Sequence, residues 1–310
     1  MMKRIKLLTL TLVMALLIAA LAGCADSPRG EQNNESITVT DMSGREVTLD
    51  APAKRVVVIN AADCEILYSI GAGDAVVGRG TYCNYPEEVN SVQIVPSEYQ
   101  IDAENIIALE PDLVILGTMY NPDQNIPILE QARIKVIITS PATIEEVYTA
   151  IDLIGVVTGK STEADVVIDS MKALFEDIKS KSKEANFAEK MVYFEISPLE
   201  YGLWTAGTGT FMDEFCSIIG INNAFSDVSG WAEISEEQVI ERNPDYVVTT
   251  TMYSGEGQNP VEEILMRKAW QGIAAVRNKA VFNADSDKFS RPGPRLAEAA
   301  QQLFEFVADN

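Results

Sequence analysis

The chain has 310 residues, with 46 acidic side chains against 24 basic ones and a formal net charge of −22 at pH 7. So acidic a protein is a poor partner for nucleic acid, because phosphate recognition needs basic side chains. The chain contains no histidine, which excludes a Ser-His-Asp triad, a Cys-His pair and a histidine-rich zinc site. Its length and its 47% hydrophobic residues allow a large core and fit two domains better than one.

Residues 1–24 have the pattern of an export signal. Basic residues near the start precede an apolar run over 7–20, and a Leu-Ala-Gly-Cys tetrad ends at Cys24. The run is shorter than the roughly 20 residues that span a bilayer. The tetrad resembles a bacterial lipobox, which implies that Cys24 is lipidated and becomes the mature N-terminus. Residues 25–36 are polar, with Pro and Gly, and we expect them to form a flexible linker.

Strand and helix patterns alternate through the first half of the remaining chain. Residues 37–49 alternate around a Ser-Gly turn and predict a β-hairpin. Short apolar runs predict strands, and the stretches between them have helical periodicity. The predicted strands are 55–60, 75–80, 113–117 and 136–139, and the predicted helices are 63–70, 103–110, 122–133 and 143–158. This alternation favours a mainly parallel sheet covered by helices.

One long helix is predicted over 161–185. Its apolar residues recur at i, i+3 and i+4, which places them on one face, and Ser161 is in position to cap its start. At about 1.5 Å per residue it would be about 37 Å long, the width of a small domain. It is either an ordinary surface helix of one domain or a connection between two.

The same alternation resumes after the long helix. Strands are predicted at 191–196, 246–250 and 280–283, and helices at 211–219, 235–242, 261–269 and 294–308.

An internal repeat favours the connecting role for the long helix. Residues 101–120 align without gaps on 234–253, with nine identities in the twenty positions, and 65–71 echo 214–220 more weakly. The alternative is convergence on a common helix-Pro-Asp-strand unit. We therefore predict two similar Rossmann-like α/β lobes, 37–160 and 186–310, joined by 161–185. Each lobe is expected to be a mainly parallel sheet with helices on both faces.

Candidate ligand contacts gather near the carboxyl ends of the predicted strands, where open α/β sheets bind ligands. Aromatic side chains there suit a large or flat ligand, although core packing is the commoner role of any one aromatic residue. Arg291 and Arg295 precede the last helix and either bind an anionic group or pair with carboxylates. The aromatic candidates are Tyr82, Tyr85, Tyr99, Tyr120, Tyr201, Trp204, Trp231 and Tyr253.

The cysteines other than Cys24 do not form a metal-binding pattern. Cys64, Cys83 and Cys216 are widely spaced, without a C-x-x-C motif. A bridge between Cys64 and Cys83 is conceivable in an exported protein, and the sequence leaves it open.

Several motifs together resemble the helix-backbone class of ABC-importer substrate-binding proteins, which capture ferric siderophores, haem or cobalamin. The resemblance covers nearly the whole chain after the linker. Its motifs are the lipobox, the hairpin, the Arg55 strand with the Glu65 helix and Gly71-Ala72-Gly73-Asp74, Tyr82-Cys83-Asn84-Tyr85-Pro86, and Ala108-Leu109-Glu110-Pro111-Asp112-Leu113. In that class one long helix joins two lobes that move little.

The resemblance implies partners and a location. The partners would be an ABC permease dimer with its ATPase subunits and a metal-chelate ligand, with no nucleic acid. The protein would be lipid-anchored on the outer face of the cytoplasmic membrane. By motif, Glu104 and Glu237 look like the two carboxylates that dock on the permease, a pairing that suits a two-fold partner. Their alternative role is that of solvent-exposed glutamates.

The resemblance also implies ligand contacts. Tyr82 and Trp231 would lie at the cleft, with no direct metal ligand and no resident cofactor. Family members that bind zinc or manganese use histidines that this chain lacks. An anionic ferric siderophore would use Arg291 and Arg295, with Arg79 as a further candidate, whereas cobalamin would rely on Tyr and Trp surfaces. The arginines favour the siderophore, with cobalamin close behind and haem open.

Two other functions stay open at this point. An exported α/β enzyme acting on a nucleotide or sugar has weak support from Gly71-x-Gly73 and from Gly207-Thr208-Gly209, since amides at a helix start can hold phosphate. Neither stretch matches G-x-G-x-x-G or the Walker pattern, so we expect no enzyme. A sensor that presents its ligand to a membrane receptor would share the fold and the anchor.

Overall fold

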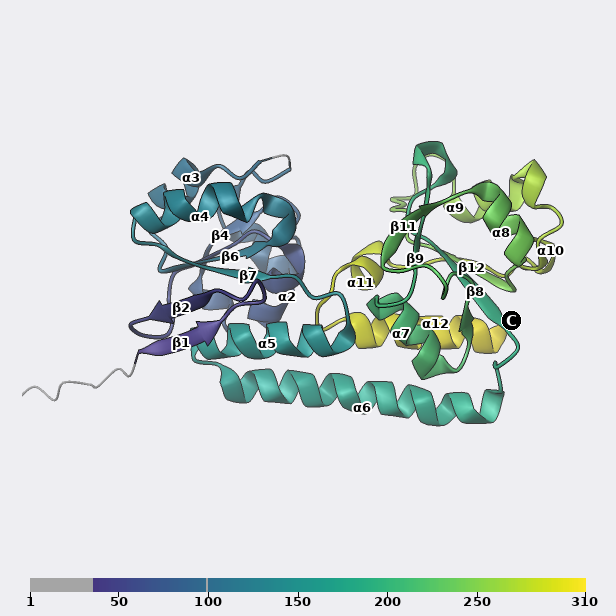
Figure 1. Cartoon of the computed structure of the whole chain (residues 1–310), viewed down its shortest axis with the longest axis horizontal. Helices are drawn as coiled ribbons and strands as arrows, with labels where there is room; N and C mark the ends of the chain where they lie inside the picture. The colour runs from purple at the N-terminus through teal and green to yellow at the C-terminus, as the bar shows by residue number, and fades with distance from the viewer. Residues whose placement is uncertain (1–35, 99) are drawn as a thin grey trace, which may run out of the picture. The chain divides into compact units, whose positions relative to one another are not determined.

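The computed structural model describes residues 36–98 and 100–310, and Ser36–Asn310 form one compact unit. Within this unit each half of the chain forms its own parallel sheet, and one long helix runs past both halves (Figure 1). The predicted α/β class is therefore confirmed. None of the described helices is both long enough and apolar enough to cross a membrane.

The sheet of the N-terminal half has five parallel strands in the order β5-β4-β3-β6-β7. β6 and β7 pair along their whole length, from Leu113 opposite Lys135 to Gly117 opposite Thr139. The predicted hairpin precedes this sheet as the antiparallel pair β1 (Ile37–Thr40) and β2 (Glu46–Leu49). The sheet strands are β3 (Val56–Val58), β4 (Val76–Gly80), β5 (Ile94–Val95), β6 (Leu113–Gly117) and β7 (Lys135–Thr139).

Helices cover both faces of this sheet. Val56 and Ile115 belong to one hydrophobic cluster with residues of α2 and α5, whereas Val57, Val114 and Leu116 belong to another with α3 and α4. Successive strand residues point to opposite faces, which explains this division. The helices are α2 (Ala61–Ser69), α3 (Ala103–Ala108), α4 (Pro122–Gln131) and α5 (Ile144–Thr158), with short 3₁₀ helices η1 (Gly73–Ala75), η2 (Glu87–Ser91) and η3 (Thr118–Tyr120).

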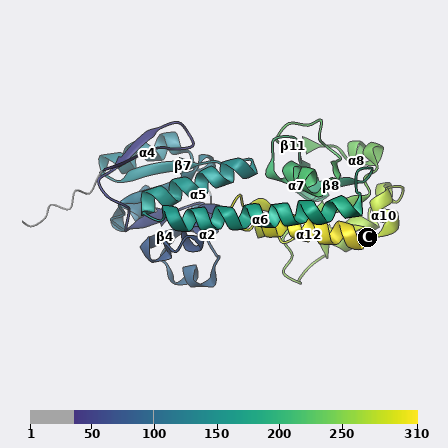
Figure 2. The same ribbon diagram turned by 90° about the horizontal axis from the view of Figure 1, so that it is seen from below.

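The long helix α6 spans Ser161–Ala185, the residues that the sequence predicts. Its buried residues are Ala164, Ile168, Met171, Phe175, Ile178 and Ser182. They pack against α5 from the N-terminal half and against α7 and α12 from the C-terminal half, and Figure 2 shows α6 beside α5 and α12. The predicted cap at Ser161 is wrong. Lys160 is the N-cap residue and makes no side-chain cap, and Ser161 already lies in the first turn.

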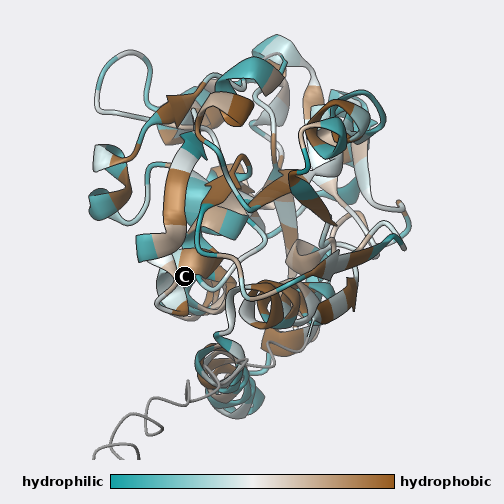
Figure 3. Ribbon diagram, turned by 90° about the vertical axis from the view of Figure 1, so that its left-hand side faces the viewer, coloured by the Kyte–Doolittle hydropathy of each residue, from teal (hydrophilic) through white to brown (hydrophobic). Residues whose placement is uncertain are grey.

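The C-terminal half repeats the design with a four-stranded parallel sheet in the order β10-β8-β12-β13. Figure 3, in which the N-terminal half faces the viewer, shows hydrophobic residues along the strands between the helices. The strands are β8 (Met191–Glu195), β10 (Asn222–Asn223), β12 (Tyr246–Thr249) and β13 (Val281–Asn283). The helices are α7 (Phe211–Ile219), α8 (Glu236–Arg242), α9 (Pro260–Met266), α10 (Ala274–Asn278), α11 (Ser286–Ser290) and α12 (Leu296–Asp309), with η4 (Leu199–Tyr201) and η5 (Lys268–Trp270).

An antiparallel strand pair in this half was not predicted. β9 (Leu203–Ala206) pairs with β11 (Trp231–Ile234), with Trp204 opposite Glu233 and Trp231 opposite Ala206. Helix α7 and a loop separate the two strands in the sequence, so no short turn marks the pair. The strand pair adds a second, small sheet to the C-terminal half.

The internal repeat has a structural counterpart. In both halves a short helix, α3 or α8, leads through Pro-Asp into an interior strand, β6 or β12, that lies next to an edge strand. The two aspartates play the same role, because Asp112 Oδ2 accepts from the backbone N–H of Arg55 at 2.9 Å and Asp245 Oδ2 accepts from that of Met191 at 3.0 Å. Each carboxylate thus anchors the start of the neighbouring strand, which gives the repeated Pro-Asp a physical reason.

Candidate functional site

Several predicted binding residues of the N-terminal half lie along one edge of its sheet, where the parallel strands end. Tyr82 follows β4 and is 55% exposed, and Tyr85 is exposed in the same loop. Thr118 after β6 and Ser140 after β7 join their hydroxyl oxygens at 3.0 Å. Tyr120 is half-buried, and burial raises the pKa of its phenol. Tyr82 and Tyr85 therefore offer exposed rings.

The loop that carries Tyr82 is held from inside. The Arg79 guanidinium is buried and donates to the backbone oxygen of Cys83 at 2.7 Å and to that of Val92 at 3.3 Å. The guanidinium of Arg79 is therefore not exposed, so nothing in the structure supports its predicted contact with a siderophore. Cys64 and Cys83 are free, buried thiols, so the conceivable bridge between them is not formed, and Cys216 is also free and buried.

Arg291 and Arg295 meet a carboxylate of the N-terminal half instead of open solvent. Glu65 on α2 accepts from Arg291 at 2.9 Å and from Arg295 at 2.7 and 2.6 Å, and its side chain is 1% exposed. The Arg295 guanidinium also lies 4.0 Å from the centre of the Tyr85 ring. The sequence left two roles open for Arg291 and Arg295, binding an anionic group or pairing with carboxylates. The structure shows the pairing, and the carboxylate that they meet is buried. That they bind an anion stays a prediction, and an anion would compete with Glu65.

Sequence reasoning did not assign a role to Glu65. A signal was present, because Asp63 and Glu65 are charged residues within an otherwise apolar stretch that forms α2. Both are buried. Charged residues are rarely buried without a partner, so their position predicts either ion pairs or a special role.

Two exposed tryptophans form a surface on the β9–β11 strand pair. Trp204 and Trp231 are each 40% exposed, and the pairing register puts them on the same face with Glu233. Trp231 also packs edge-on against Phe211, with ring centres 5.3 Å apart. The backbone N–H of Phe211 donates to the backbone oxygen of Ala142 at 2.8 Å. The Trp231 end of this surface therefore lies close to the N-terminal half.

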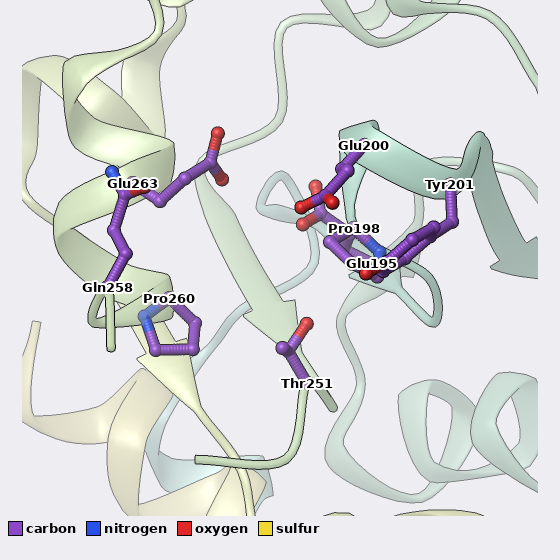
Figure 4. A pocket seen from close by; sticks show the side chains of 8 residues that line it. All are labelled: Glu195, Pro198, Glu200, Tyr201, Thr251, Gln258, Pro260 and Glu263. Carbon is purple, nitrogen blue, oxygen red and sulfur yellow. The ribbon is translucent and has the colours of Figure 1, made fainter. Parts of the chain in front are cut away.

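A pocket of about 280 Å³ lies at the carboxyl ends of β8 and β12 (Figure 4). Glu263 points into it from one side, and Glu195 and Glu200 from the other. No basic side chain is among the described residues that line it. The pocket therefore presents mainly hydrogen-bond acceptors. Its lining residues are Glu195, Pro198, Glu200, Tyr201, Thr251, Gln258, Pro260 and Glu263.

The back of this pocket is a buried ion cluster that the sequence did not reveal. Arg267 donates to both Glu195 oxygens, at 2.6 and 2.9 Å, and to Glu263 at 3.0 Å. Burial raises the pKa of Glu195, while the Arg267 guanidinium lowers it. The close pairing keeps Glu195 ionised, because both of its oxygens accept from a cation.

The structure describes some of the remaining predicted contact residues and not others. Tyr201 is strongly exposed and lines the acidic pocket, and Tyr253 after β12 is 38% exposed. Tyr99 and Cys24 lie outside the described residues. Ligand contact by any of these residues stays a prediction.

The predicted docking glutamates occupy equivalent places in the two halves. Glu104 and Glu237 are exposed in the first turns of α3 and α8. The side chains of Asp102 and Ser235 cap these helices in the same way, each accepting from the backbone N–H three residues on. The backbone N–H of Glu237 and the Ser235 side chain lower the pKa of the Glu237 carboxyl.

The glycine stretch before α7 offers little room for a phosphate. A Cβ on Gly207 would meet the Val228 backbone oxygen at 2.1 Å. Two early amides of α7 are already bonded, Phe211 N–H to Ala142 and Asp213 N–H to the Thr210 hydroxyl. Within residues 36–98 and 100–310, no group of three or more Cys, Asp or Glu side chains is arranged to hold a metal ion.

Comparisons with known proteins agree with one another. A family model described as periplasmic binding protein matches residues 56–288. A Bacillus subtilis protein named uncharacterized ABC transporter substrate-binding lipoprotein YvrC is 35% identical over 306 residues, covering 94% of this chain and 95% of that protein. A vitamin B12-binding protein of Pectobacterium carotovorum is 25% identical, covering 81% and 87%.

A solved structure from Staphylococcus epidermidis, described as a possible iron-binding, periplasmic solute-binding protein, has a similar fold. It superposes with a TM-score of 0.71 at 27% identity and covers 82% of this chain and 98% of its own.

Proposed function

Because this chain belongs to the periplasmic binding protein family, as a substrate-binding protein of an ABC transporter, we propose that it captures a metal chelate and delivers it to an importer. The ligand that we favour is a corrinoid such as cobalamin. The observation that carries this proposal is the exposed Trp204–Trp231 surface on the β9–β11 strand pair. Such a surface suits a large, partly apolar ligand.

Charge separates the candidate ligands. The sequence favoured an anionic ferric siderophore on the expectation that Arg291 and Arg295 are free, but both are bonded to Glu65. The pocket of Figure 4 has three carboxylates and no basic side chain among its described lining residues, and Arg267 behind it offsets one of the three negative charges. An anionic chelate would be repelled there, whereas the peripheral amides of a corrinoid would donate hydrogen bonds. This argument moves cobalamin ahead of the siderophore, with haem, which carries carboxylates, behind.

The names of relatives support the same ligand class. The Pectobacterium relative is named a vitamin B12-binding protein and the Staphylococcus structure a possible iron-binding protein. Both terms fit a metal chelate. We propose that the chain binds this chelate through protein surfaces alone, without a resident cofactor, a direct metal ligand or a catalytic step.

Delivery would use the two equivalent glutamates. Glu104 and Glu237 are exposed at matching places in the two halves, so they fit a partner with two-fold symmetry such as a permease dimer with its ATPase subunits. The Bacillus relative is named a lipoprotein. We propose the same anchoring here, through Cys24, on the outer face of the cytoplasmic membrane.

Ligand binding is tested by titrating the domain that starts after Cys24 with cyanocobalamin, an anionic ferric catecholate, a ferric hydroxamate and haem. Quenching of Trp204 and Trp231 should saturate with cyanocobalamin. Trp270 is fully buried and serves as an internal reference, so a Trp204→Phe/Trp231→Phe variant should lose most of the response. Saturation by the catecholate alone would restore the siderophore hypothesis.

Docking is tested by reversing both charges. Glu104→Lys with Glu237→Lys should abolish uptake by cells and leave ligand affinity unchanged. The matched control is Glu184→Lys with Glu189→Lys, two exposed residues near the end of α6 that produce the same change in net charge. Equal uptake by the two double variants would refute the docking role of these two glutamates.

A further inference from the structure

A buried carboxylate lies beneath the candidate ligand surface of the N-terminal half. Asp63 is the third residue of α2 and is completely buried. Its Oδ2 accepts from the Thr139 hydroxyl at 2.5 Å. Its Oδ1 is shielded from solvent and has no hydrogen-bond partner among the described residues. A buried carboxylate oxygen without a partner is costly when ionised.

The position of Asp63 links three strand ends. α2 starts directly after β3, with Asn60 as its N-cap residue, and Thr139 is the last residue of β7. Tyr120, just after β6, lies close enough that the charge of Asp63 contributes to raising the pKa of its phenol. Asp63 thus lies beneath the sheet edge that carries the predicted ligand contacts of the N-terminal half.

The groups around Asp63 do not neutralise it. Burial raises the pKa of Asp63 to about 7, and only the hydrogen bond from Thr139 and the nearby Asn60 side chain oppose this shift. Arg79 on β4 faces the same region, but its guanidinium donates to backbone oxygens. The other titratable groups nearby are Cys64 and Glu65 on α2, Cys83 after β4 and Tyr120 after β6.

The fold does not require a carboxylate at this place. In the weak repeat that aligns Glu65 with Glu214, the residue equivalent to Asp63 is Met212, which is buried in the core. The C-terminal half builds the same helix with an apolar side chain there. The carboxylate is therefore a feature of one half only.

We propose that Asp63 is a proton-linked positioning residue, which makes capture of the ligand dependent on pH. This inference rests on the proposed ligand surface. Asp63 is already shut off from solvent, but a ligand over this edge would replace the bulk water beyond it with a less polar environment, which further disfavours the ionised form of Asp63. By linkage, the ligand binds more tightly when Asp63 carries its proton, so affinity falls as the pH rises through neutrality.

The test compares the wild-type domain with Asp63→Asn, which imitates the neutral carboxyl. Cyanocobalamin is the probe, because it carries no group that titrates in the range used. Between about pH 6 and about pH 8, wild-type affinity should fall by up to about tenfold for each unit by which bound ligand raises the pKa. Asp63→Asn should stay flat, at the wild-type value of the acid end. Parallel curves for the two proteins would overturn the inference.

A second variant keeps the ionisable group. Thr139→Val removes the hydrogen bond that favours the ionised form, so the midpoint of the affinity change should move to higher pH. A purely structural role of Asp63 would not move a midpoint. An unchanged midpoint would therefore count against the proposal, even if Asp63→Asn failed to fold.

A readout without ligand separates this inference from the proposed function. The infrared band of a protonated carboxylic acid should be present in the wild type at about pH 6, decline towards about pH 8, and be absent in Asp63→Asn. Absence of the band at the acid end would refute the inference, whatever ligand binds. If the band titrates but no chelate binds, the proposed function fails, and so does the link between proton and ligand.

Discussion

Two carboxylates at equivalent positions of the weak repeat, Glu65 and Glu214, both reach from one half of the chain to the other, but with different partners. Glu65 on α2 accepts from Arg291 and Arg295, which lie just before α12. Glu214 on α7 accepts from the backbone N–H of Ile144, the first residue of α5, at 2.6 Å. Each carboxylate meets the start of a helix in the opposite half.

The two contacts differ in charge and in burial. The Glu65 contact joins a fully buried anion to two largely buried cations, so removing one partner leaves charge buried without compensation. The Glu214 contact joins a half-buried anion to one helix amide and to the positive end of a helix dipole. The same geometry therefore serves as an ion pair on one side and as a helix cap on the other.

The largest effect is expected from Glu65→Gln. It leaves both guanidinium groups without a carboxylate, and the free energy of unfolding should fall by about 3 kcal/mol. Urea denaturation followed by circular dichroism measures this. The control is Glu88→Gln, an exposed residue, which should change stability by less than about 0.5 kcal/mol. A loss no larger than that of the control would show that the ion pairs contribute little.

Arg295→Lys should have an intermediate effect of about 1–2 kcal/mol. Lysine keeps the charge but loses the two-pronged contact with Glu65 and the stacking on the Tyr85 ring. Combined with Glu65→Gln, the two changes should cost less than their sum, because they remove the same contact. Simple additivity in this double-mutant cycle would contradict direct coupling.

Glu214→Gln should have a smaller effect, of about 1 kcal/mol or less at neutral pH. The amide oxygen can still accept from the Ile144 N–H, so the helix cap persists without its charge. Thermal unfolding beside the Glu65→Gln protein measures the difference between the two contacts. If both variants lost equal stability, the distinction between ion pair and cap would be wrong.

The smallest effect concerns pH. Burial raises the pKa of the Glu214 carboxyl, and the nearby acids Asp213, Glu145 and Glu146 raise it further, while the Ile144 N–H lowers it. The Glu214 carboxyl then holds its proton more tightly in the folded state than in the unfolded state. Its contribution to the free energy of unfolding therefore falls as the pH rises from its unfolded pKa to its folded pKa.

The measurement is the stability difference between wild type and Glu214→Gln across the acid range. Wild type should be relatively more stable at the acid end. A difference that grows in the opposite direction would reverse the sign argued for this carboxyl.

Local patterns in the sequence determined much of the fold. The α/β class, the bounds of α6 and the order of helix, Pro-Asp and strand in both halves follow from periodicity and from short motifs. The repeat by itself also predicts that Glu104 and Glu237 lie at matching helix starts. These features depend on residues close together in the chain.

The tertiary structure decided what depends on distant partners. The bonds from Arg291 and Arg295 to Glu65 span 226 and 230 residues, so the sequence could not show that these cations were engaged. The β9–β11 strand pair, the Arg267–Glu195 ion pair and the isolation of Asp63 also depend on residues that are distant in the sequence. Sequence patterns report which face of an element is apolar, but only the packed fold decides which charge meets which, and that pairing sets the character of the candidate site.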